Sequence, residues 1–338
     1  MFRSALRLLA VSIPLALIGP AMAIGPDNQV VGGAIGSQWG GVVRILLNTN
    51  VGANTGSFNG TGTIIGNVNQ QGQGWYCILT ADHVVSTNGP GDPTAAGIGA
   101  VQMNSVGNGG DDGVAAWPVM AGYAVRTKSL FGPASAVDLA LVAVNYGAYN
   151  AGNDIYVRNL VADNSHRTFS IIGFGQEARR VATGYQGVGN YGTQRYENNV
   201  VNRYSPNFSN GGYTYDAVIS KIIFDPGTVF PGTGAAYDGD SGAPLFTSGV
   251  ASEPGQGISY YAYDVFGVHQ GGQGRGVGRQ FRDYGMDQYH VWLSGTTGTH
   301  DGQNYISHIN RVCGMVPEPS TLVALSLGAL ALLRRRRR

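Results

Sequence analysis

Short apolar runs separated by glycine-rich stretches are the feature that most limits what this chain can fold into. Each run is about as long as a β-strand, and none continues with the period of an amphipathic helix. Glycine supplies 54 of the 338 residues and gathers between the runs, at 107–113, 184–192 and 271–278, where turns are expected. The runs are Val42–Leu47, Thr61–Ile65, Trp75–Leu79, Leu139–Val144, Phe169–Ile172, Ala217–Ile223 and Tyr260–Val268. The pattern predicts an all-β body.

One segment near the end departs from this pattern. Tyr305, Ile306, Ile309 and Val312 recur at helical spacing and predict a closing α-helix over 304–312. With 43% hydrophobic and 12% charged residues, the chain is too apolar to be disordered. We therefore expect an all-β fold, a sandwich or barrels, that ends in one helix.

The first 23 residues have the three parts of a secretory signal peptide. Arg3 and Arg7 give a basic start, residues 8–18 an apolar core, and Ala21-Met22-Ala23 a cleavage site of small residues. The apolar core is too short to span a bilayer comfortably, so removal by signal peptidase is expected. The alternative is a buried N-terminal helix.

The last residues, 314–338, form a second segment outside the body. Val316-Pro317-Glu318-Pro319-Ser320 is followed by an apolar stretch at 322–333 and by five arginines. Such a run halts translocation with its basic end in the cytoplasm, although a permanent span needs about 20 residues. The segment resembles the PEP-CTERM sorting signal of bacterial exported proteins, which implies an exosortase-type membrane enzyme as partner. A plain C-terminal membrane anchor is the alternative.

These segments imply an exported protein that is periplasmic, on the cell surface or extracellular. The C-terminal tail, as a short transmembrane segment, would give transient contact with the inner membrane. The two ends hold seven of the 21 basic residues and one of the 20 acidic residues, so the body has 14 basic and 19 acidic residues. A body with a net charge near −5 lacks the basic face that a nucleic-acid partner requires.

The only cysteines are Cys77 and Cys313. In an exported protein they can form one disulfide, but the sequence alone does not decide whether they do. His300, Asp301 and His308 fit no standard spacing of metal ligands. We therefore expect no metal and no other cofactor.

Three short motifs hold residues suited to hydrolysis. Thr80-Ala81-Asp82-His83 follows one apolar run, Asp138 opens another, and Gly239-Asp240-Ser241-Gly242 places a serine in a tight turn. An imidazole can remove the proton of a serine hydroxyl at neutral pH, and a buried carboxylate fixes its tautomer. A glycine at 239 allows the N–H groups of Gly239 and Ser241 to converge as an oxyanion hole. The motifs therefore favour a catalytic triad.

The order His, Asp, Ser differs from that of subtilisins and of α/β-hydrolases, which disfavours an esterase-like hydrolase. In this order and at these spacings the motifs resemble the trypsin/chymotrypsin-like serine peptidases, over about residues 30–312. The resemblance implies two six-stranded antiparallel β-barrels with the site between them. His83 and Asp138 would come from a first domain at 24–157. Ser241 would come from a second at 158–313, which includes the closing helix.

The resemblance also implies roles for residues around the triad. Ala235, Ala236, His269, Gln270 and Gly271 would contact the polypeptide substrate. Gln270 stands where the family usually has a serine that touches the catalytic aspartate. The family's terminal helix packs near the histidine strand, which favours a disulfide between Cys77 and Cys313.

Asp240 matches the residue that pairs with a freed N-terminal amine in the family. A buried carboxylate needs such a partner. Cleavage before Ile24 or before Val30 would supply the amine, and the sequence does not choose between them. Capping of a surface turn by Asp240 is the alternative.

The base of the family's specificity pocket corresponds to Ala235, so a preference for Arg or Lys is not expected. Small or apolar residues before the scissile bond fit this position. His269 leaves a preference for Glu open, because glutamyl endopeptidases have a histidine at the matching place, and Arg275 lies nearby in sequence.

The predicted function is that of a serine endopeptidase that forms an acyl-enzyme on Ser241. The alternative is a surface binding protein that keeps the trypsin fold but has weak catalysis. Gln270 keeps this alternative open, whereas the intact Ser241, His83 and Asp138 speak against it.

Overall fold

The computed structural model describes the body of the chain in segments. These are residues 41–47, 59–70, 73–86, 98–103, 117–125, 130–131, 135–145, 159–162, 168–189, 195–223, 235–247, 250–252, 259–261, 264–276 and 281–313. The expected signal peptide and the expected tail, with its short transmembrane segment, lie outside them. Within these segments no helix is long and apolar enough to cross a membrane.

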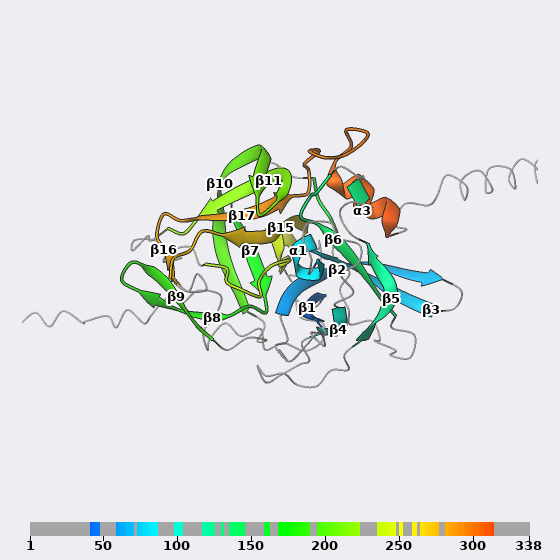
Figure 1. The fold of residues 1–338 in the computed structure, drawn as a ribbon, viewed down its shortest axis with the longest axis horizontal. Coiled ribbons are helices and arrows are strands. Elements are labelled where there is room, and N and C mark those ends of the chain that lie inside the picture. Colours follow the sequence, from blue (N-terminus) through cyan, green and yellow to red (C-terminus); the bar gives the residue numbers. More distant parts are fainter. Residues whose placement is uncertain are drawn as a thin grey trace, which may run out of the picture.

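Two closed β-barrels form the body (Figure 1). The first consists of β1 (Val42–Leu47), β2 (Asn59–Gln70), β3 (Gln73–Thr80), β4 (Ile98–Met103), β5 (Trp117–Val125) and β6 (Ala140–Asn145). The second consists of β7 (Thr168–Gly173), β10 (Arg195–Asn210), β11 (Tyr213–Lys221), β12 (Pro244–Thr247), β15 (Val265–Gly272) and β17 (Asp287–Trp292). The all-β fold with a closing helix is therefore confirmed.

The two barrels share one topology. Around each closed sheet, the strands follow the order first, second, third, sixth, fifth and fourth of that barrel's own chain order. All of these neighbours pair antiparallel, as short strands joined by turns do. The domain boundary expected between residues 157 and 158 falls outside the described segments and stays a prediction.

Smaller elements decorate the barrels. β8 (Glu177–Val181), β9 (Gly184–Gly189) and β16 (Phe281–Asp283) form a three-stranded sheet, and β13 (Val250–Ser252) pairs with β14 (Ser259–Tyr261). A four-residue helix, α1 (Asp82–Val85), follows β3 directly, and α3 (Tyr305–Val312) ends the described chain.

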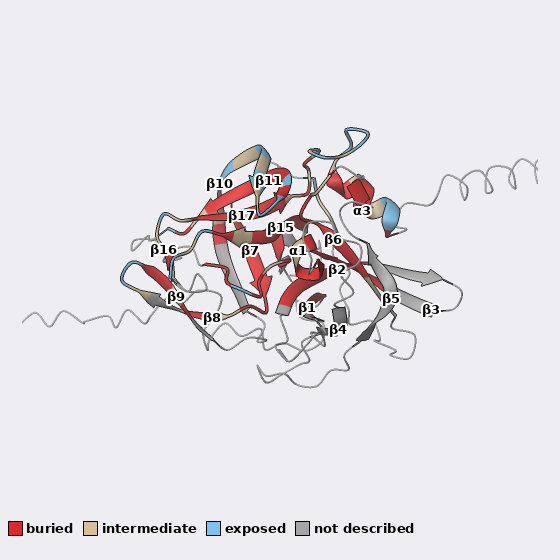
Figure 2. Cartoon of the chain, in the orientation of Figure 1, coloured by how far each residue is buried: buried red, intermediate tan, exposed pale blue. Residues whose placement is uncertain are grey.

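The core extends from one barrel into the other. One cluster of buried side chains includes Ile64 and Leu79 of the first barrel together with Tyr215 and Val291 of the second. A separate cluster fills the second barrel and contains Phe169, Ile171, Val218, Leu245 and Phe266. In the view of Figure 2, buried strands of both barrels lie on either side of α1. Because the interface is part of a core, it can hold side chains from both barrels at fixed positions.

Helix α3 follows the second barrel in sequence but packs on the first. Tyr305 contacts Phe131, which precedes β6, with ring centroids 5.0 Å apart. The side chain of Asn304 caps the helix by accepting from the N–H of Ser307 at 3.0 Å. The predicted closing helix is thus present, although Val312, expected on its apolar face, is exposed.

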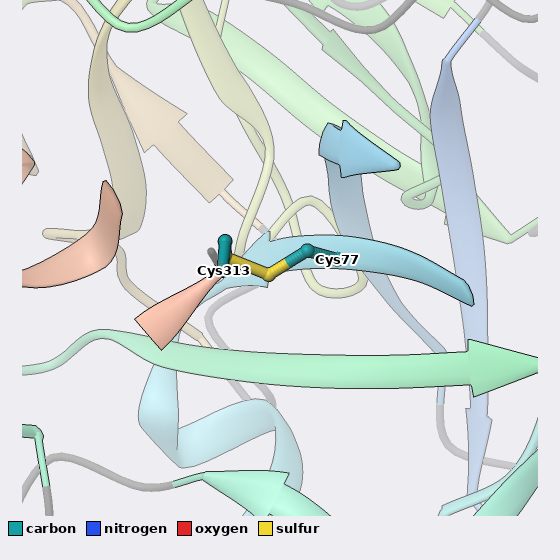
Figure 3. Close-up of a disulfide and its surroundings, with 2 residues drawn as sticks. All are labelled: Cys77 and Cys313. Atoms are coloured by element: carbon teal, nitrogen blue, oxygen red, sulfur yellow. A yellow bond between two sulfur atoms is a disulfide. The ribbon is translucent and has the colours of Figure 1, made fainter. Parts of the chain in front are cut away.

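A disulfide joins Cys77 of β3 to Cys313 at the end of α3, with Cα atoms 5.9 Å apart (Figure 3). The pairing suggested by the family resemblance is therefore present. The bond ties the end of the described chain to the strand that leads to His83.

Candidate active site

His83 and Asp138 meet at the end of two paired strands. β3 pairs with β6 up to Thr80 and Ala140, so the residues that follow β3 lie beside those that precede β6. The Nδ1 atom of His83 lies 2.8 Å from Oδ2 of Asp138, and the backbone N–H of His83 donates to Oδ1 at 2.9 Å. The Asp138 side chain is fully buried and that of His83 is 28% exposed. The carboxylate thus fixes the ring and favours the tautomer in which Nε2 accepts a proton.

The pKa of His83 is shifted by opposing effects. Burial alone lowers it, but the charge and the hydrogen bond of Asp138, together with the charge of Asp82, raise it above the ordinary 6.5. A raised pKa means that the surroundings stabilise the imidazolium form. This is the form that a general base adopts after it has taken a proton.

The loop before β12 presents Ser241 between two glycines in the left-handed region of φ. Gly239 has φ 94° and Gly242 has φ 85°, which side chains with a Cβ rarely adopt. The N–H of Gly242 donates to the carbonyl of His269 at 2.8 Å. By contrast, the N–H groups of Gly239 and Ser241 donate to no residue in the described segments. These two donors are the ones that the sequence assigned to an oxyanion hole.

Thr61 of the first barrel holds this loop of the second barrel. Its N–H donates to the carbonyl of Ser241 at 2.8 Å, and its hydroxyl donates to the carbonyl of Gly239 at 2.9 Å. Its carbonyl accepts from the hydroxyl of Thr80, three residues before His83, at 2.7 Å. Ser241 therefore sits beside the segment that leads to His83. The described segments show no hydrogen bond between Ser241 Oγ and the His83 ring.

Asp240 lies in the interior and does not cap a surface turn. Its carboxylate is fully buried and accepts from the N–H groups of Gly175 and Tyr237, each at 2.8 Å. A Cβ atom at Gly173 or Gly175 would lie within 2.5 Å of this carboxylate. The surface-turn alternative is therefore wrong. The expected amine partners, Ile24 or Val30, lie outside the described segments.

Ala235 and Ala236 are buried directly upstream of the serine loop. The amide oxygen of Gln288, on β17, accepts from the N–H of Ala236 at 2.8 Å. Gln288 pairs in register with Gly272 of β15, and its side chain reaches from β17 to the segment before Ser241. Sequence reasoning missed Gln288, because no motif surrounds it and only the strand register brings it here.

His269 belongs to a buried chain of polar groups. Its Nδ1 atom lies 3.1 Å from Nδ1 of His290, whose Nε2 lies 2.9 Å from the hydroxyl of Ser220. Burial lowers the pKa of His290 to about 3. Burial, with the charges of His290 and Arg282, lowers the pKa of His269 well below 6.5. Both rings are therefore neutral near pH 7.

The other expected substrate contacts lie beside His269 on β15. The amide oxygen of Gln270 accepts from the side-chain amide of Asn210 at 2.8 Å, and Gly271 follows it with open space where a Cβ would be. Arg275 binds the carboxylate of Asp283 and lies 4.7 Å from the centroid of the Phe281 ring. The Arg275 guanidinium is thus paired with a carboxylate of β16.

No group of three or more metal-ligating side chains occurs in the part of the chain that the structure describes. The structure brings His83, Asp138 and the loop of Ser241 to one place between the barrels. Asp82, Thr61 and Tyr213 also lie there but were not assigned a role from the sequence. Of these, only Asp82 carried a signal, as the neighbour of His83 within the same motif.

Comparisons with known proteins place the C-terminal segment in a family. Residues 316–338 match the model of the PEP-CTERM protein-sorting motif. The match indicates an exported protein that is sorted to the cell envelope or surface, and implies processing by an exosortase-type enzyme. No curated protein matches the sequence.

Two solved structures align with most of the chain. The protease Anisep from Arthrobacter nicotinovorans is 11% identical, with a TM-score of 0.45, and the match covers 87% of this chain and 99% of that one. The Rv3671c protein of M. tuberculosis H37Rv, in an inactive form, is 13% identical, with a TM-score of 0.42, and the match covers 85% and 98% of the two chains.

Proposed function

We propose that the protein is a serine endopeptidase in which Ser241 is the nucleophile, His83 the general base and acid, and Asp138 the group that orients His83. One observation carries the proposal. The buried carboxylate of Asp138 binds both Nδ1 and the backbone N–H of His83, at 2.8 and 2.9 Å, in the interface where the Ser241 loop is docked. A carboxylate with this geometry leaves Nε2 directed away from it as the only basic nitrogen.

The chemistry follows from these positions. When substrate binds, the Ser241 hydroxyl transfers its proton to Nε2 of His83 while Oγ forms a bond to the peptide carbonyl carbon. The imidazolium then gives this proton to the leaving amine, and an acyl-enzyme on Ser241 remains. Water repeats the two steps and releases the acid. We expect the hydrogen bond between the Ser241 hydroxyl and His83 to form when substrate binds. In free enzymes, catalytic hydrogen bonds are often long and shorten only in the complex with substrate.

The N–H groups of Gly239 and Ser241 would stabilise the oxyanion. The N–H groups of the neighbouring Asp240, Gly242 and Ala243 are all used inside the loop or by β15, whereas those of Gly239 and Ser241 are not. These two donors therefore remain available to the negative charge that develops on the substrate carbonyl oxygen. Loss of one donor of this type typically costs about 3 kcal/mol of transition-state stabilisation.

The residue accepted before the scissile bond would be small or apolar. Ala235 and Ala236 bring no charge, and Gln288 occupies space beside them. His269 is neutral near pH 7 and Arg275 is bound to Asp283, so neither supplies a free cation for a glutamate. A peptide-library cleavage profile tests this, and enrichment of Glu, Arg or Lys at that position would contradict it.

Labelling with a serine-directed fluorophosphonate tests the catalytic proposal. The processed protein should be modified at Ser241, and Ser241→Ala should abolish the label. His83→Ala should slow labelling strongly, whereas Ser307→Ala, on α3, should label like the unmodified protein. Folded, processed protein that takes no label would favour the binding-protein alternative.

A further inference from the structure

The tip of the β10–β11 hairpin reaches from the second barrel to the first. Gly211 and Gly212 join the strands with φ 60° and 85°, which is the backbone that a tight two-residue hairpin turn needs. This turn places Asn210 and Tyr213 opposite each other in register. Their side chains therefore extend from the end of a rigid ladder, and what they contact is fixed by the turn.

The tip binds the chain just before each of two triad positions. The hydroxyl of Tyr213 donates to Oδ2 of Asp82, the residue before His83, at 2.9 Å. The backbone N–H of Thr214 donates to the carbonyl of Ala136, two residues before Asp138, at 3.0 Å. One hairpin thus holds both segments that bring the imidazole and its carboxylate together.

The hairpin is itself held on the other side of the site. The side-chain amide of Asn210 donates to Gln270 of β15 at 2.8 Å. Gln270 follows His269, whose carbonyl accepts from the N–H of Gly242 in the serine loop. The position of Tyr213 is therefore set by the strand that also holds the serine loop.

Asp82 is a fully buried carboxylate in α1. Its Oδ2 also accepts from the hydroxyl of Ser86 at 3.0 Å. Buried carboxylates require such donors, and hydrogen bonds to a charged acceptor are stronger than those to a neutral one. The Tyr213 ring lies 6.4 Å, centroid to centroid, from the His83 ring, so the residue that donates to Asp82 is also a neighbour of the imidazole.

We propose that Tyr213 and Asp82 are positioning residues for His83: the hairpin of the second barrel fixes the Asp82 carboxylate, and Asp82 holds α1 and stabilises the imidazolium. The inference rests on the proposed role of His83 as general base. It adds a second carboxylate to the site and gives the second barrel direct control of the histidine of the first.

The charges around His83 agree with this role. Asp82 and Asp138 are the two groups that raise the pKa of His83. On β11 and β15, Tyr215 and His269 are neutral near pH 7, since burial raises the pKa of Tyr215 well above 10 and lowers that of His269. Tyr213, which donates to Asp82, lies on the same strand as Tyr215. Removal of the Asp82 charge should therefore lower the pKa of His83, because Tyr215 and His269 have no charge that could compensate for it.

The first test is the pH dependence of kcat/KM, or of the labelling rate, in Asp82→Asn. The amide keeps the size and an acceptor for Tyr213 but removes the charge. The acid limb should move to lower pH by about half a unit or more. A limb that stays in place would overturn the proposal. Tyr213→Phe keeps the charge of Asp82, so the acid limb of its pH profile should move much less.

The second test is a double-mutant cycle. Tyr213→Phe should lower kcat about fivefold with little change in KM, which is the size expected for one hydrogen bond. In the Asp82→Ala background, which has no acceptor for the hydroxyl, the same substitution should change kcat less than twofold, because Tyr213 acts through the Asp82 carboxylate. Additive losses would show that Tyr213 acts independently and would overturn the proposal.

Ser209→Ala is the matched control. The hydroxyls of Ser209 and Thr214 are 3.0 Å apart on the exposed side of the same hairpin, away from Asp82. This variant loses one hydroxyl from the tip and should leave the pH profile and kcat unchanged. A loss equal to that of Tyr213→Phe would mean that hairpin stability alone explains the effect, against the proposal.

A titration of the His83 ring by NMR separates this proposal from the proposed function. In Ser241→Ala protein, with His83→Gln used for assignment, Asp82→Asn should lower the pKa of the ring. If unmodified protein is not labelled at Ser241, the proposed function fails and the titration alone decides the role of Asp82. If labelling occurs but neither the titration nor the cycle responds, only the positioning proposal fails.

Discussion

The hydroxyl of Thr61 donates to the carbonyl of Gly239 at 2.9 Å, although 178 residues separate them in the chain. The same oxygen accepts from the N–H of Phe174 at 3.1 Å. Thr61 is on β2 of the first barrel, and both of its partners belong to the second. One buried threonine therefore fixes the serine loop relative to the barrel that holds the histidine.

Thr61→Val removes this link while keeping the shape of the side chain. We expect a loss of about 1–3 kcal/mol in the free energy of unfolding, because a buried carbonyl and a buried N–H lose their partner. Labelling of Ser241 should slow as well. Urea unfolding and labelling rates measure the two effects, and Thr61→Ser should restore both. A Val variant that labels at the normal rate would show that the loop is positioned without Thr61.

The proposed activity should depend on the protonation of His83. Because its pKa is raised above 6.5, the imidazole becomes protonated at a higher pH than a free histidine. The labelling rate should therefore fall as the pH decreases through a midpoint above 6.5. A pH–rate profile between pH 5 and 9 measures this midpoint. A midpoint below 6.5 would contradict the arrangement around His83.

Gly242 should not tolerate a side chain. Its φ is 85°, and a Cβ atom would lie 2.1 Å from the carbonyl oxygen of Thr61. Gly285 is the matched control, with φ 90° and nothing within 4 Å of a built Cβ. Gly285→Ala should cost about 1–2 kcal/mol from backbone strain alone. Gly242→Ala should cost more and abolish labelling, and equal costs in thermal unfolding would refute the close approach.

The Cys77–Cys313 bond should contribute to stability. It spans 236 residues of sequence and holds α3 on the first barrel. The double substitution Cys77→Ala, Cys313→Ala should lower the free energy of unfolding by about 2–4 kcal/mol, as measured in urea. Unfolded, unreduced protein should show no free thiols. Two titratable thiols in the mature protein would exclude the bond.

Asp216 should make stability depend on pH. Its carboxylate accepts from the N–H groups of Asn207, Thr296 and Thr297 and from the Thr297 hydroxyl. Burial raises its pKa, but these hydrogen bonds together lower it below the usual 3.8. The stabilisation is therefore present above the unfolded-state pKa, near 4, and is lost as the pH falls through the lower folded-state value.

The acid unfolding curves of two variants test the role of Asp216. Asp216→Asn should lower stability at pH 7 and flatten the loss of stability below pH 4. Asp238→Asn, on an exposed side chain, should leave the acid unfolding curve unchanged. Identical curves for both variants and the unmodified protein would show that Asp216 does not contribute.

Much of the secondary structure could be predicted because its signals depend on residues that are close together in the sequence. Strand-length apolar runs predicted barrel strands such as β1 and β3, and the spacing of Tyr305, Ile306 and Ile309 predicted α3. Strand periodicity and helical periodicity depend only on neighbouring residues. Val312 was misassigned because periodicity alone does not say where a helix leaves its packing surface.

The residues of the candidate site also fall into two groups, those that a local motif identifies and those that it does not. His83, Asp138, Ser241 and Gly239 were found from the sequence because each stands in a short motif whose chemistry is recognisable. Gln288, Thr61 and Tyr213 stand in no motif. They reach the site through strand register, barrel closure and a two-residue turn, which are relations between distant segments.

The sequence by itself determined the all-β class, the closing helix, the sorting motif and the residues suited to acyl transfer. Only the tertiary structure decided that Asp138 binds His83, that Cys77 and Cys313 pair, that Asp240 is buried and that Tyr213 reaches Asp82. The physical reason is that residue type and local period act over a few positions. Contacts between the barrels depend on how two closed sheets pack, which no short stretch of sequence encodes.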